Sequence, residues 1–401
     1  MKDIKDIVVS VVIPARNEFP NIVHTVYSIV NDLETFLSPA EFEIIIVANC
    51  IDDWYKCERG RRALYGTVDY FCGMGMYWNK VIRFIYDPIA GNHSARNKGA
   101  DMARGKYLFI SDAHMSYKHG FFKQMIETID KTGGLVHGAI GWLGAYPADK
   151  STGFQYTVKL GDEIRGTWNN YKLADDYFYI PMQGHCCLGV KRDQFMLFGG
   201  YPTYHRCYGG GEFYLDSKWW MFGSNVCVEP KAIGYHLRSS RGYTYDYSDY
   251  IHNVMAIGMA LGMDGWTERA YLNWLRNRPK ELMDKLWNEA EKETVEDREF
   301  IKKHSIMTYN ELIVEKPWDK LNDELYGRHN SSMIVFHDTW LNMIKGTPSE
   351  ELFNNSETQK ELTNFIEDKL SEFIYKREHK PNVQDVVYKC TGDTCTGDIL
   401  K

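Results

Sequence analysis

Residues 7–14 read Ile-Val-Val-Ser-Val-Val-Ile-Pro, and this stretch decides the fold. A continuous β-branched run is typical of a parallel strand buried on both faces, because a strand with one solvent-exposed face alternates apolar and polar residues. The run stops at Pro14, and a helical period extends from about Asn21 to Leu33. A strand followed directly by a helix is the unit from which parallel sheets are built.

Three more apolar runs show the same pattern, at residues 42–47, 81–86 and 107–110, with a helix expected over 94–103. This order predicts an α/β fold with a doubly wound, mostly parallel sheet, whose ligand binds beyond the carboxyl ends of the strands. Polar residues come after those ends at Arg16, Asn17, Glu18, Asn49, Asp112 and His114. Their placement predicts a nucleotide site.

The chain changes character after about residue 264. Residues 145–182 look like an elaborated loop region, 183–241 return to strand-and-turn character, and the remainder is helical and acidic. From Gly265 to the end there are 20 Lys and Arg against 26 Asp and Glu, so this part carries most of the net charge of −7. We expect a catalytic domain at 1–264 and a mainly helical acidic region at 265–401 for acceptor or oligomer contacts.

Composition excludes several classes of protein. A chain of 401 residues with 44% hydrophobic and 14% aromatic content suits a globular protein and excludes a disordered one. The net charge of −7 argues against a broad basic face that grips a polyanion. No apolar run approaches the roughly 20 residues of a membrane span, and the N-terminus shows no leader pattern. We therefore expect a cytoplasmic location, or the host cytoplasm if the protein is viral.

The nine cysteines form an odd set without regular spacing, which predicts reduced thiols rather than a disulfide framework. Two of them repeat in the tail as Cys390-Thr-Gly-Asp and Cys395-Thr-Gly-Asp. Two cysteines alone make a poor zinc site, so a flexible tail is the favoured interpretation there.

Asp112-Ala113-His114 is the main candidate for chemistry. Residues two apart in an extended segment point to the same side, so the carboxylate and the imidazole can face one divalent ion. Such an ion neutralises the charge that develops on a diphosphate leaving group, and this ligand set suits Mn²⁺ or Mg²⁺. The alternative is a helix-capping aspartate followed by a surface histidine.

Three segments carry a family resemblance over roughly residues 7–245: 11–18, which end in Arg-Asn-Glu; 91–100, which contain Ala-Arg-Asn-Lys-Gly; and 103–112. Together they resemble the family-2 glycosyltransferases of GT-A fold. The resemblance implies a strand end that lines the nucleotide, a helix beneath the diphosphate and an acidic strand end that binds the metal. The donor-binding residues that it implies are Pro14, Arg16, Asn17, Glu18, Asn49, Arg96, Asp112, Ala113, Arg238 and Tyr243.

His114 stands where that family usually has a second aspartate. This D-x-H form resembles the polypeptide N-acetylgalactosaminyltransferases, which add a distant histidine as a third ligand. Gly234-Tyr-His-Leu-Arg238 is similar to that segment apart from a shift of one residue. The resemblance therefore implies Mn²⁺ or Mg²⁺ on Asp112, His114 and His236. Asn49 departs from the family's acidic pair, which leaves the nucleobase open, and Arg238 and Tyr243 fall where related enzymes have a closing loop.

Tyr208-Gly-Gly-Gly-Glu212 resembles the segment that lines the donor sugar and acceptor in related transferases. Inverting relatives commonly have a second carboxylate directly after the glutamate, and it acts as the general base. Phe213 stands there in this chain, which favours retention with Glu212 at the sugar–acceptor junction. Asp216 is the possible base if the reaction inverts.

We therefore predict a metal-dependent glycosyltransferase that moves a sugar from a UDP-sugar to an acceptor hydroxyl. A non-catalytic nucleotide-sugar-binding module is the alternative from another class. A nucleotidyltransferase is disfavoured, because Pro14-Ala-Arg-Asn-Glu18 lacks a glycine-rich loop. The sequence leaves open whether the acceptor is a glycan, a protein or a hydroxymethylated DNA base, and it leaves the oligomeric state open.

Overall fold

A computed structural model describes residues 6–49, 66, 70–71, 81–89, 91–143, 154–160, 166–170, 172–237, 245–327, 386–391 and 394–399. They belong to two units, Met1–Phe336 and His337–Lys401. In the second unit, β12 (Val386–Thr391) and β13 (Thr394–Ile399) pair antiparallel, with Cys390 opposite Cys395. This differs from the flexible tail that the sequence favours, and the β-branched valines and threonines of the two segments explain the strands.

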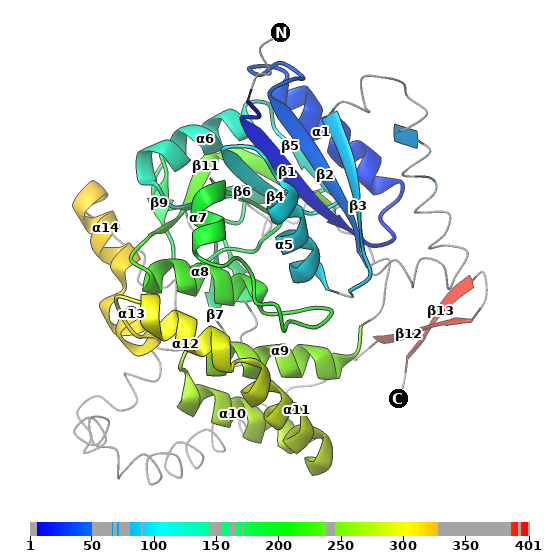
Figure 1. The fold of residues 1–401 in the computed structure, drawn as a ribbon, viewed down its shortest axis with the longest axis vertical. Coiled ribbons are helices and arrows are strands. Elements are labelled where there is room, and N and C mark those ends of the chain that lie inside the picture. The colour runs from blue at the N-terminus through cyan, green and yellow to red at the C-terminus, as the bar shows by residue number, and fades with distance from the viewer. Residues whose placement is uncertain are drawn as a thin grey trace. The chain divides into compact units, whose positions relative to one another are not determined.

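The first unit is built on a nine-stranded sheet in the order β3-β2-β1-β4-β10-β6-β11-β5, with β9 also paired to β11 (Figure 1). Strands β3, β2, β1 and β4 run parallel, and β6 and β11 form another parallel pair. Antiparallel β10 joins these two groups. The strands are β1 (Val9–Ala15), β2 (Phe42–Asn49), β3 (Ile82–Asp87), β4 (Tyr107–Ser111), β5 (Met115–Tyr117), β6 (Leu135–Leu143), β9 (Phe178–Tyr179), β10 (Cys187–Lys191) and β11 (Val226–Leu237).

The four predicted strands are present and begin and end within two residues of the expected positions. The region expected to be an elaborated loop contains a separate small sheet of β7 (Thr157–Leu160) and β8 (Gly166–Asn169) in its described part. The predicted α/β class is therefore confirmed. Strands β10 and β11 fall within residues 183–241, where strand-and-turn character is expected, but the sequence does not predict that β10 runs antiparallel to its neighbours.

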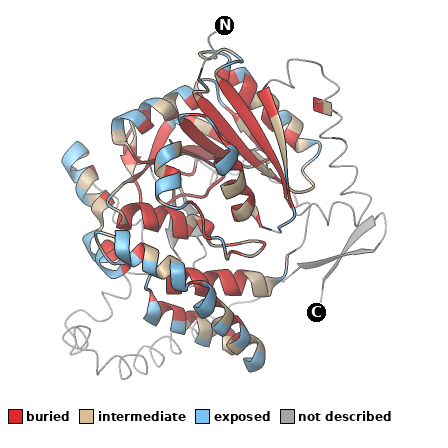
Figure 2. Ribbon diagram, viewed as in Figure 1, coloured by how far each residue is buried: buried red, intermediate tan, exposed pale blue. Residues whose placement is uncertain are grey.

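Helices cover both faces of this sheet. One core cluster joins Val9, Val11 and Ile13 of β1 to α1 (Asn21–Leu33) and α6 (Phe121–Thr132). The other joins Val12 to α5 (Asn92–Met102), α7 (Arg192–Leu197) and α8 (Gly211–Met221). Alternate side chains of β1 therefore enter different cores, as expected for a strand buried on both faces. Figure 2 shows that the central strands of the sheet are largely buried.

Helix α5 packs unusually close to β1. A Cβ atom on Gly99 would lie 2.2 Å from Cγ1 of Val12, so only glycine allows this approach. The close packing fixes the amino-terminal end of α5 beside the carboxyl end of β1, where Arg16 begins the following turn.

The helices after residue 246 pack on the same core as the sheet. Their bounds are α9 (Tyr247–Ala260), α10 (Asp264–Leu275), α11 (Lys280–Glu293), α12 (Val295–His304), α13 (Tyr309–Glu315) and α14 (Pro317–Tyr326). Trp318 is buried with its ring 5.8 Å from that of Trp220, and the amide of Asn322 pairs with both the N–H and the C=O of Tyr179. The predicted division at residue 265 stays a prediction. Among the described helices, none is long and apolar enough to cross a membrane.

Candidate active site

A cavity of about 630 Å³ lies beyond the carboxyl ends of β1, β2 and β4, where a doubly wound sheet places its ligand. Its lining gathers side chains that are far apart in the sequence. The predicted residues that line it are Pro14, Arg16, Glu18, Asn49, Arg96, Asp112, Ala113, His114, Glu212 and His236. Asn17 and Asp216 are not part of the lining, and Arg238 and Tyr243 lie outside the described residues.

Asp112 occupies the first position after β4. Its N–H donates to the carbonyl of Cys186 at 2.8 Å, which extends the ladder between β4 and β10. Its Oδ1 lies 3.2 Å from Nη2 of Arg96, and its Oδ2 lies 3.5 Å from Nε2 of His236. Burial acts to raise the pKa of Asp112, but the hydrogen bond with His236 and the charge of Arg96 outweigh it and hold that pKa well below its usual range. The side chain is therefore a carboxylate at neutral pH.

His114 and His236 are brought together by the pairing of β5 with β11. His236 is opposite Met115 in that ladder, and the N–H of Leu237 donates to the carbonyl of His114 at 3.0 Å. The Nε2 atoms of the two imidazoles lie 3.0 Å apart, with the rings nearly perpendicular. This separation suits either an N–H···N hydrogen bond or two neighbouring ligands of one cation.

Glu18 orients His114. Its Oε2 lies 3.0 Å from Nδ1 of His114, on the side of the ring opposite His236. A carboxylate that accepts from Nδ1–H fixes the tautomer in which the Nε2 lone pair is available to a metal. The sequence placed Glu18 at the nucleotide but did not reveal this contact, which depends on β1 and β4 being neighbours in the sheet.

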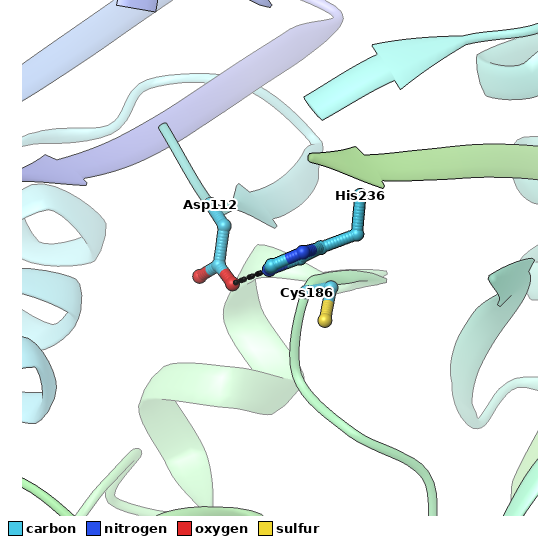
Figure 3. A group of neighbouring side chains, drawn as sticks. All are labelled: Asp112, Cys186 and His236. Atoms are coloured by element: carbon cyan, nitrogen blue, oxygen red, sulfur yellow. Dashed lines mark ion pairs between the residues drawn. The ribbon is translucent and has the colours of Figure 1, made fainter. Parts of the chain in front are cut away.

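Cys186 is a cavity residue that the sequence did not reveal. Its thiol, the carboxylate of Asp112 and the imidazole of His236 have ligand atoms within 4.8 Å of one another (Figure 3). Cys186 directly precedes β10, whose first residue is opposite Ser111 of β4, so the antiparallel ladder delivers the thiol beside Asp112. Burial raises the pKa of this thiol well above its usual value, and the nearby carboxylates of Asp112 and Glu212 act in the same direction.

Arg96 is a buried cation at the cavity wall, with 3% of its side chain exposed. Its Nη2 donates to Asp112 and, at 3.0 Å, to the carbonyl of His185. The guanidinium lies 5.3 Å from the ring centre of Tyr201. Its Nε and Nη1 have no hydrogen-bond partner among the described residues. Two buried donors on a fixed cation suit an anionic ligand.

The side-chain amide of Asn49, which the resemblance places among the donor-binding residues, is used by the backbone of a neighbouring turn. Its Nδ2 donates to the carbonyls of Ile89 at 2.6 Å and Gly91 at 2.9 Å, and its Oδ1 accepts from the N–H of Gly91. Its amide therefore holds the turn that leads into α5. Arg16 lines the cavity, where its Nη1 lies 3.2 Å from Sγ of Cys207.

Glu212 enters the cavity from the start of α8. Gly209 and Gly210 have φ values of 112° and 79°, a left-handed backbone that favours glycine, and the helix begins directly after them. Glu212 lies in the first turn and lines the cavity. No hydrogen bond or ion pair joins its carboxylate to another described residue, so it is available to a ligand.

Asp216 lies one turn further along α8 but in the protein interior. Its Oδ1 is 3.0 Å from Nε2 of His185 and 3.3 Å from Nε2 of His137, and its Oδ2 accepts from the N–H of Gln183 at 2.9 Å. All three side chains of this cluster are fully buried. The structure therefore does not place Asp216, the predicted alternative base, where it would meet a ligand in the cavity.

The Asp216 cluster predicts a pH dependence of stability. Burial acts to raise the pKa of Asp216, but His137 and His185 outweigh it and lower that pKa to about 2, below the usual value of 3.8. A depressed carboxylate pKa stabilises the fold above the unfolded-state pKa, and the stabilisation is lost as pH falls. We expect Asp216→Asn to lower the free energy of unfolding by about 2 kcal/mol at pH 7, with the difference shrinking between about pH 4 and pH 2.

Urea unfolding of both proteins at several pH values measures this difference. Asp193→Asn, in which an exposed carboxylate on α7 is replaced, is the control and should leave the free energy of unfolding unchanged. A difference between Asp216→Asn and the unmodified chain that stays constant down to pH 3 would contradict the prediction.

Comparison with known proteins gives partial matches. The sequence profile of glycosyl transferase family 2 matches residues 10–195. Polypeptide N-acetylgalactosaminyltransferase 3 of Drosophila melanogaster is 23% identical over 193 residues, which are 43% of this chain and 28% of that protein. Human polypeptide N-acetylgalactosaminyltransferase 10 is 24% identical over 232 residues, 54% of this chain and 35% of that protein. The chain thus spans about a third of the length of these relatives.

The fold is also found among solved structures. A crystal structure of GalNAc-T7 with UDP, GalNAc and Mn²⁺ superposes with a TM-score of 0.53 at 16% identity, covering 79% of this chain and 59% of that chain. At this identity the similarity shows the fold, and the GT-A fold expected from the sequence is confirmed.

Proposed function

Because residues 10–195 of this chain are a glycosyltransferase family 2 domain, we propose that it transfers a sugar from a UDP-sugar to an acceptor hydroxyl in a metal-dependent reaction. The observation that carries the proposal is the meeting of Asp112, His114 and His236 at one wall of a cavity of about 630 Å³. Cavities of about 300–1,000 Å³ are usual for small-molecule ligands.

The residues present fit a divalent cation. One carboxylate and two imidazoles supply oxygen and nitrogen ligands, and the adjoining ligand atoms are 3.0 and 3.5 Å apart. Ligands bound at about 2.1 Å around one ion have neighbours about 3 Å apart, so His236 is spaced from His114 on one side and from Asp112 on the other as neighbouring ligands of one ion would be. We propose Mn²⁺, with Mg²⁺ second. When bound, the ion would neutralise charge on the leaving diphosphate.

The cationic side chains would bind the diphosphate. Two nitrogens of the Arg96 guanidinium, Nε and Nη1, have no hydrogen-bond partner among the described residues, and the side chain lines the cavity. Arg16 lines the cavity from the end of β1. The amino-terminal end of α5, where Asn92 lines the cavity, favours an anion through its free N–H groups. The closing loop at Arg238 and Tyr243 stays a prediction, since it lies outside the described residues.

We propose retention, with Glu212 contacting the donor sugar or the acceptor. The acceptor hydroxyl would bond to the sugar carbon as the bond to the diphosphate breaks, and its proton would pass to the diphosphate. The burial of Asp216 supports this assignment, because it removes the alternative base from the cavity. The names of the relatives favour a polypeptide hydroxyl as acceptor over a glycan or a modified DNA base. The cytoplasmic location stays a prediction from the sequence.

Release of UDP tests the proposal. The purified chain is incubated with each of several UDP-sugars, with Mn²⁺ or with EDTA, and UDP is measured with and without acceptors of the three classes. We expect release that Mn²⁺ stimulates and that rises with the correct acceptor. Binding of a UDP-sugar without any metal-stimulated release would support the non-catalytic binding module instead.

The contact between Glu18 and His114 gives a further prediction. Glu18→Gln keeps the size of the side chain but removes the charge that holds the tautomer, so we expect about 10-fold weaker Mn²⁺ binding by calorimetry. Glu127→Gln, at an exposed position on α6, is the matched control. Equal Mn²⁺ affinity in Glu18→Gln and the unmodified chain would show that Glu18 does not orient a metal ligand.

A further inference from the structure

The metal centre proposed above has a sulfur atom within reach. Sγ of Cys186 and the ligand atoms of Asp112 and His236 lie within 4.8 Å of one another, and Figure 3 shows the thiol beside the imidazole–carboxylate pair. Cys186 is a free cysteine, is 7% exposed and lines the cavity. Its backbone is fixed as well, since its carbonyl accepts from the N–H of Asp112. The sheet therefore fixes the backbone of Cys186 beside Asp112, and the thiol lies within reach of the centre.

We propose that Cys186 is a ligand of this centre and that it directs the site toward borderline-soft cations such as Zn²⁺, Co²⁺ and Cd²⁺. The inference rests on the proposed function for the position of the cation. Oxygen and imidazole ligands accept Mn²⁺ readily, whereas a thiolate adds affinity chiefly for softer ions. Cys186 and His114 would then be alternative partners of Asp112 and His236, used by soft and hard cations respectively.

The net charge of the occupied site would depend on which cation is bound. When a soft cation binds, the thiol of Cys186 releases its proton to solvent, and the thiolate and the carboxylate of Asp112 together cancel the double positive charge. With Mn²⁺ on Asp112 and two neutral imidazoles, one positive charge remains to attract the donor diphosphate. We therefore expect Zn²⁺ to bind tightly, to compete with Mn²⁺ and to weaken UDP-sugar binding.

Cobalt is a suitable probe, because a thiolate bound to Co²⁺ adds a charge-transfer absorption band in the near ultraviolet. The full chain and its variants are titrated with Co²⁺ and their spectra recorded, and Zn²⁺ and Mn²⁺ affinities are measured by calorimetry. We expect the unmodified chain to show the band and Cys186→Ser to lose it. We also expect Cys186→Ser to bind Zn²⁺ at least about 10-fold more weakly, with a much smaller change for Mn²⁺.

Two other thiols provide matched controls. Cys187 is the next residue, and Cys207 lines the same cavity, so Cys187→Ser and Cys207→Ser should both keep the band. His137→Asn tests the second group of potential ligands in the described part of the chain, namely His137, His185 and Asp216, and should also keep it. Circular dichroism of each variant establishes that it is folded.

Two outcomes separate this inference from the function on which it rests. If Co²⁺ binds without the band, and His236→Ala weakens that binding while Cys186→Ser does not, the role of Cys186 is refuted and the proposed centre stands. If neither His236→Ala nor Asp112→Asn changes the affinity for any of the three cations, the proposed centre itself is refuted, and the role of Cys186 with it.

Discussion

Asp112→Asn is expected to lower Mn²⁺-dependent UDP release by about 10³-fold or more. The carboxylate is the anionic ligand of the proposed cation and also the ion-pair partner of Arg96. Its loss would weaken the metal site and leave a buried guanidinium opposite a neutral amide. A metal that stabilises transition-state charge contributes several kcal/mol, and each 1.36 kcal/mol corresponds to about tenfold in rate.

The rate is measured at saturating UDP-sugar over a range of Mn²⁺ concentrations, so that weak metal binding and slow turnover are told apart. Asp193→Asn, in which an exposed carboxylate is replaced, should retain the full rate. Thermal unfolding shows whether the Asp112 variant is folded. A folded Asp112→Asn protein with an unimpaired rate would refute the assignment of the metal centre.

Glu212→Gln is expected to lower kcat about 10²-fold, the lower end of the effect of a positioned acid–base or charge-stabilising side chain. The amide keeps the size and the hydrogen-bonding capacity of the side chain but loses its charge. No hydrogen bond or ion pair in the described part of the chain joins Glu212 to Asp112, His114 or His236. We therefore expect the affinity for Mn²⁺ to stay unchanged. A lower kcat with intact metal binding would thus separate this residue from the metal ligands.

Asp216→Asn is the matched comparison, since both carboxylates belong to α8 and lie one turn apart. At pH 7, where the folded state dominates, we expect Asp216→Asn mainly to lower the free energy of unfolding. Its effect on kcat should be smaller than that of Glu212→Gln. If Asp216→Asn abolishes turnover in the folded protein while Glu212→Gln does not, the roles are reversed and the inverting mechanism is favoured. Analysis of the anomeric configuration of the product decides retention directly.

The sequence predicted the features that depend on local pattern. The run at residues 7–14 and the three later runs are predominantly apolar, so strand positions and the polar residues at their ends could be read directly. The two-residue spacing of Asp112 and His114 after a strand can likewise be seen in the sequence itself. His236 could be placed only through the family resemblance, because nothing near it in the chain marks it as a partner of His114.

The rest depends on which strands are neighbours. Cys186 reaches Asp112 because β10 runs antiparallel beside β4. The sequence of a short strand of mixed composition does not indicate with which strand it pairs. Glu212 and Asp216 show another limit. Four residues apart on a helix they share a side, which suggests a common environment. In the structure α8 begins at the cavity and runs into the interior, so one carboxylate meets the cavity and the other meets two buried histidines.

The packing of α14 against the sheet limits where this chain can be cut to make a fusion protein or a chimera. Trp318 fills a place beside Trp220, and Asn322 pairs with the backbone of Tyr179 as a neighbouring strand would. A fusion or transplant that ends near residue 264, where the acidic helices start, would strip these partners from the sheet and leave its core open. The smallest portable unit therefore extends at least through Tyr326, and chimeras joined at the boundary after Phe336 should keep the cavity while exchanging the C-terminal remainder of the chain.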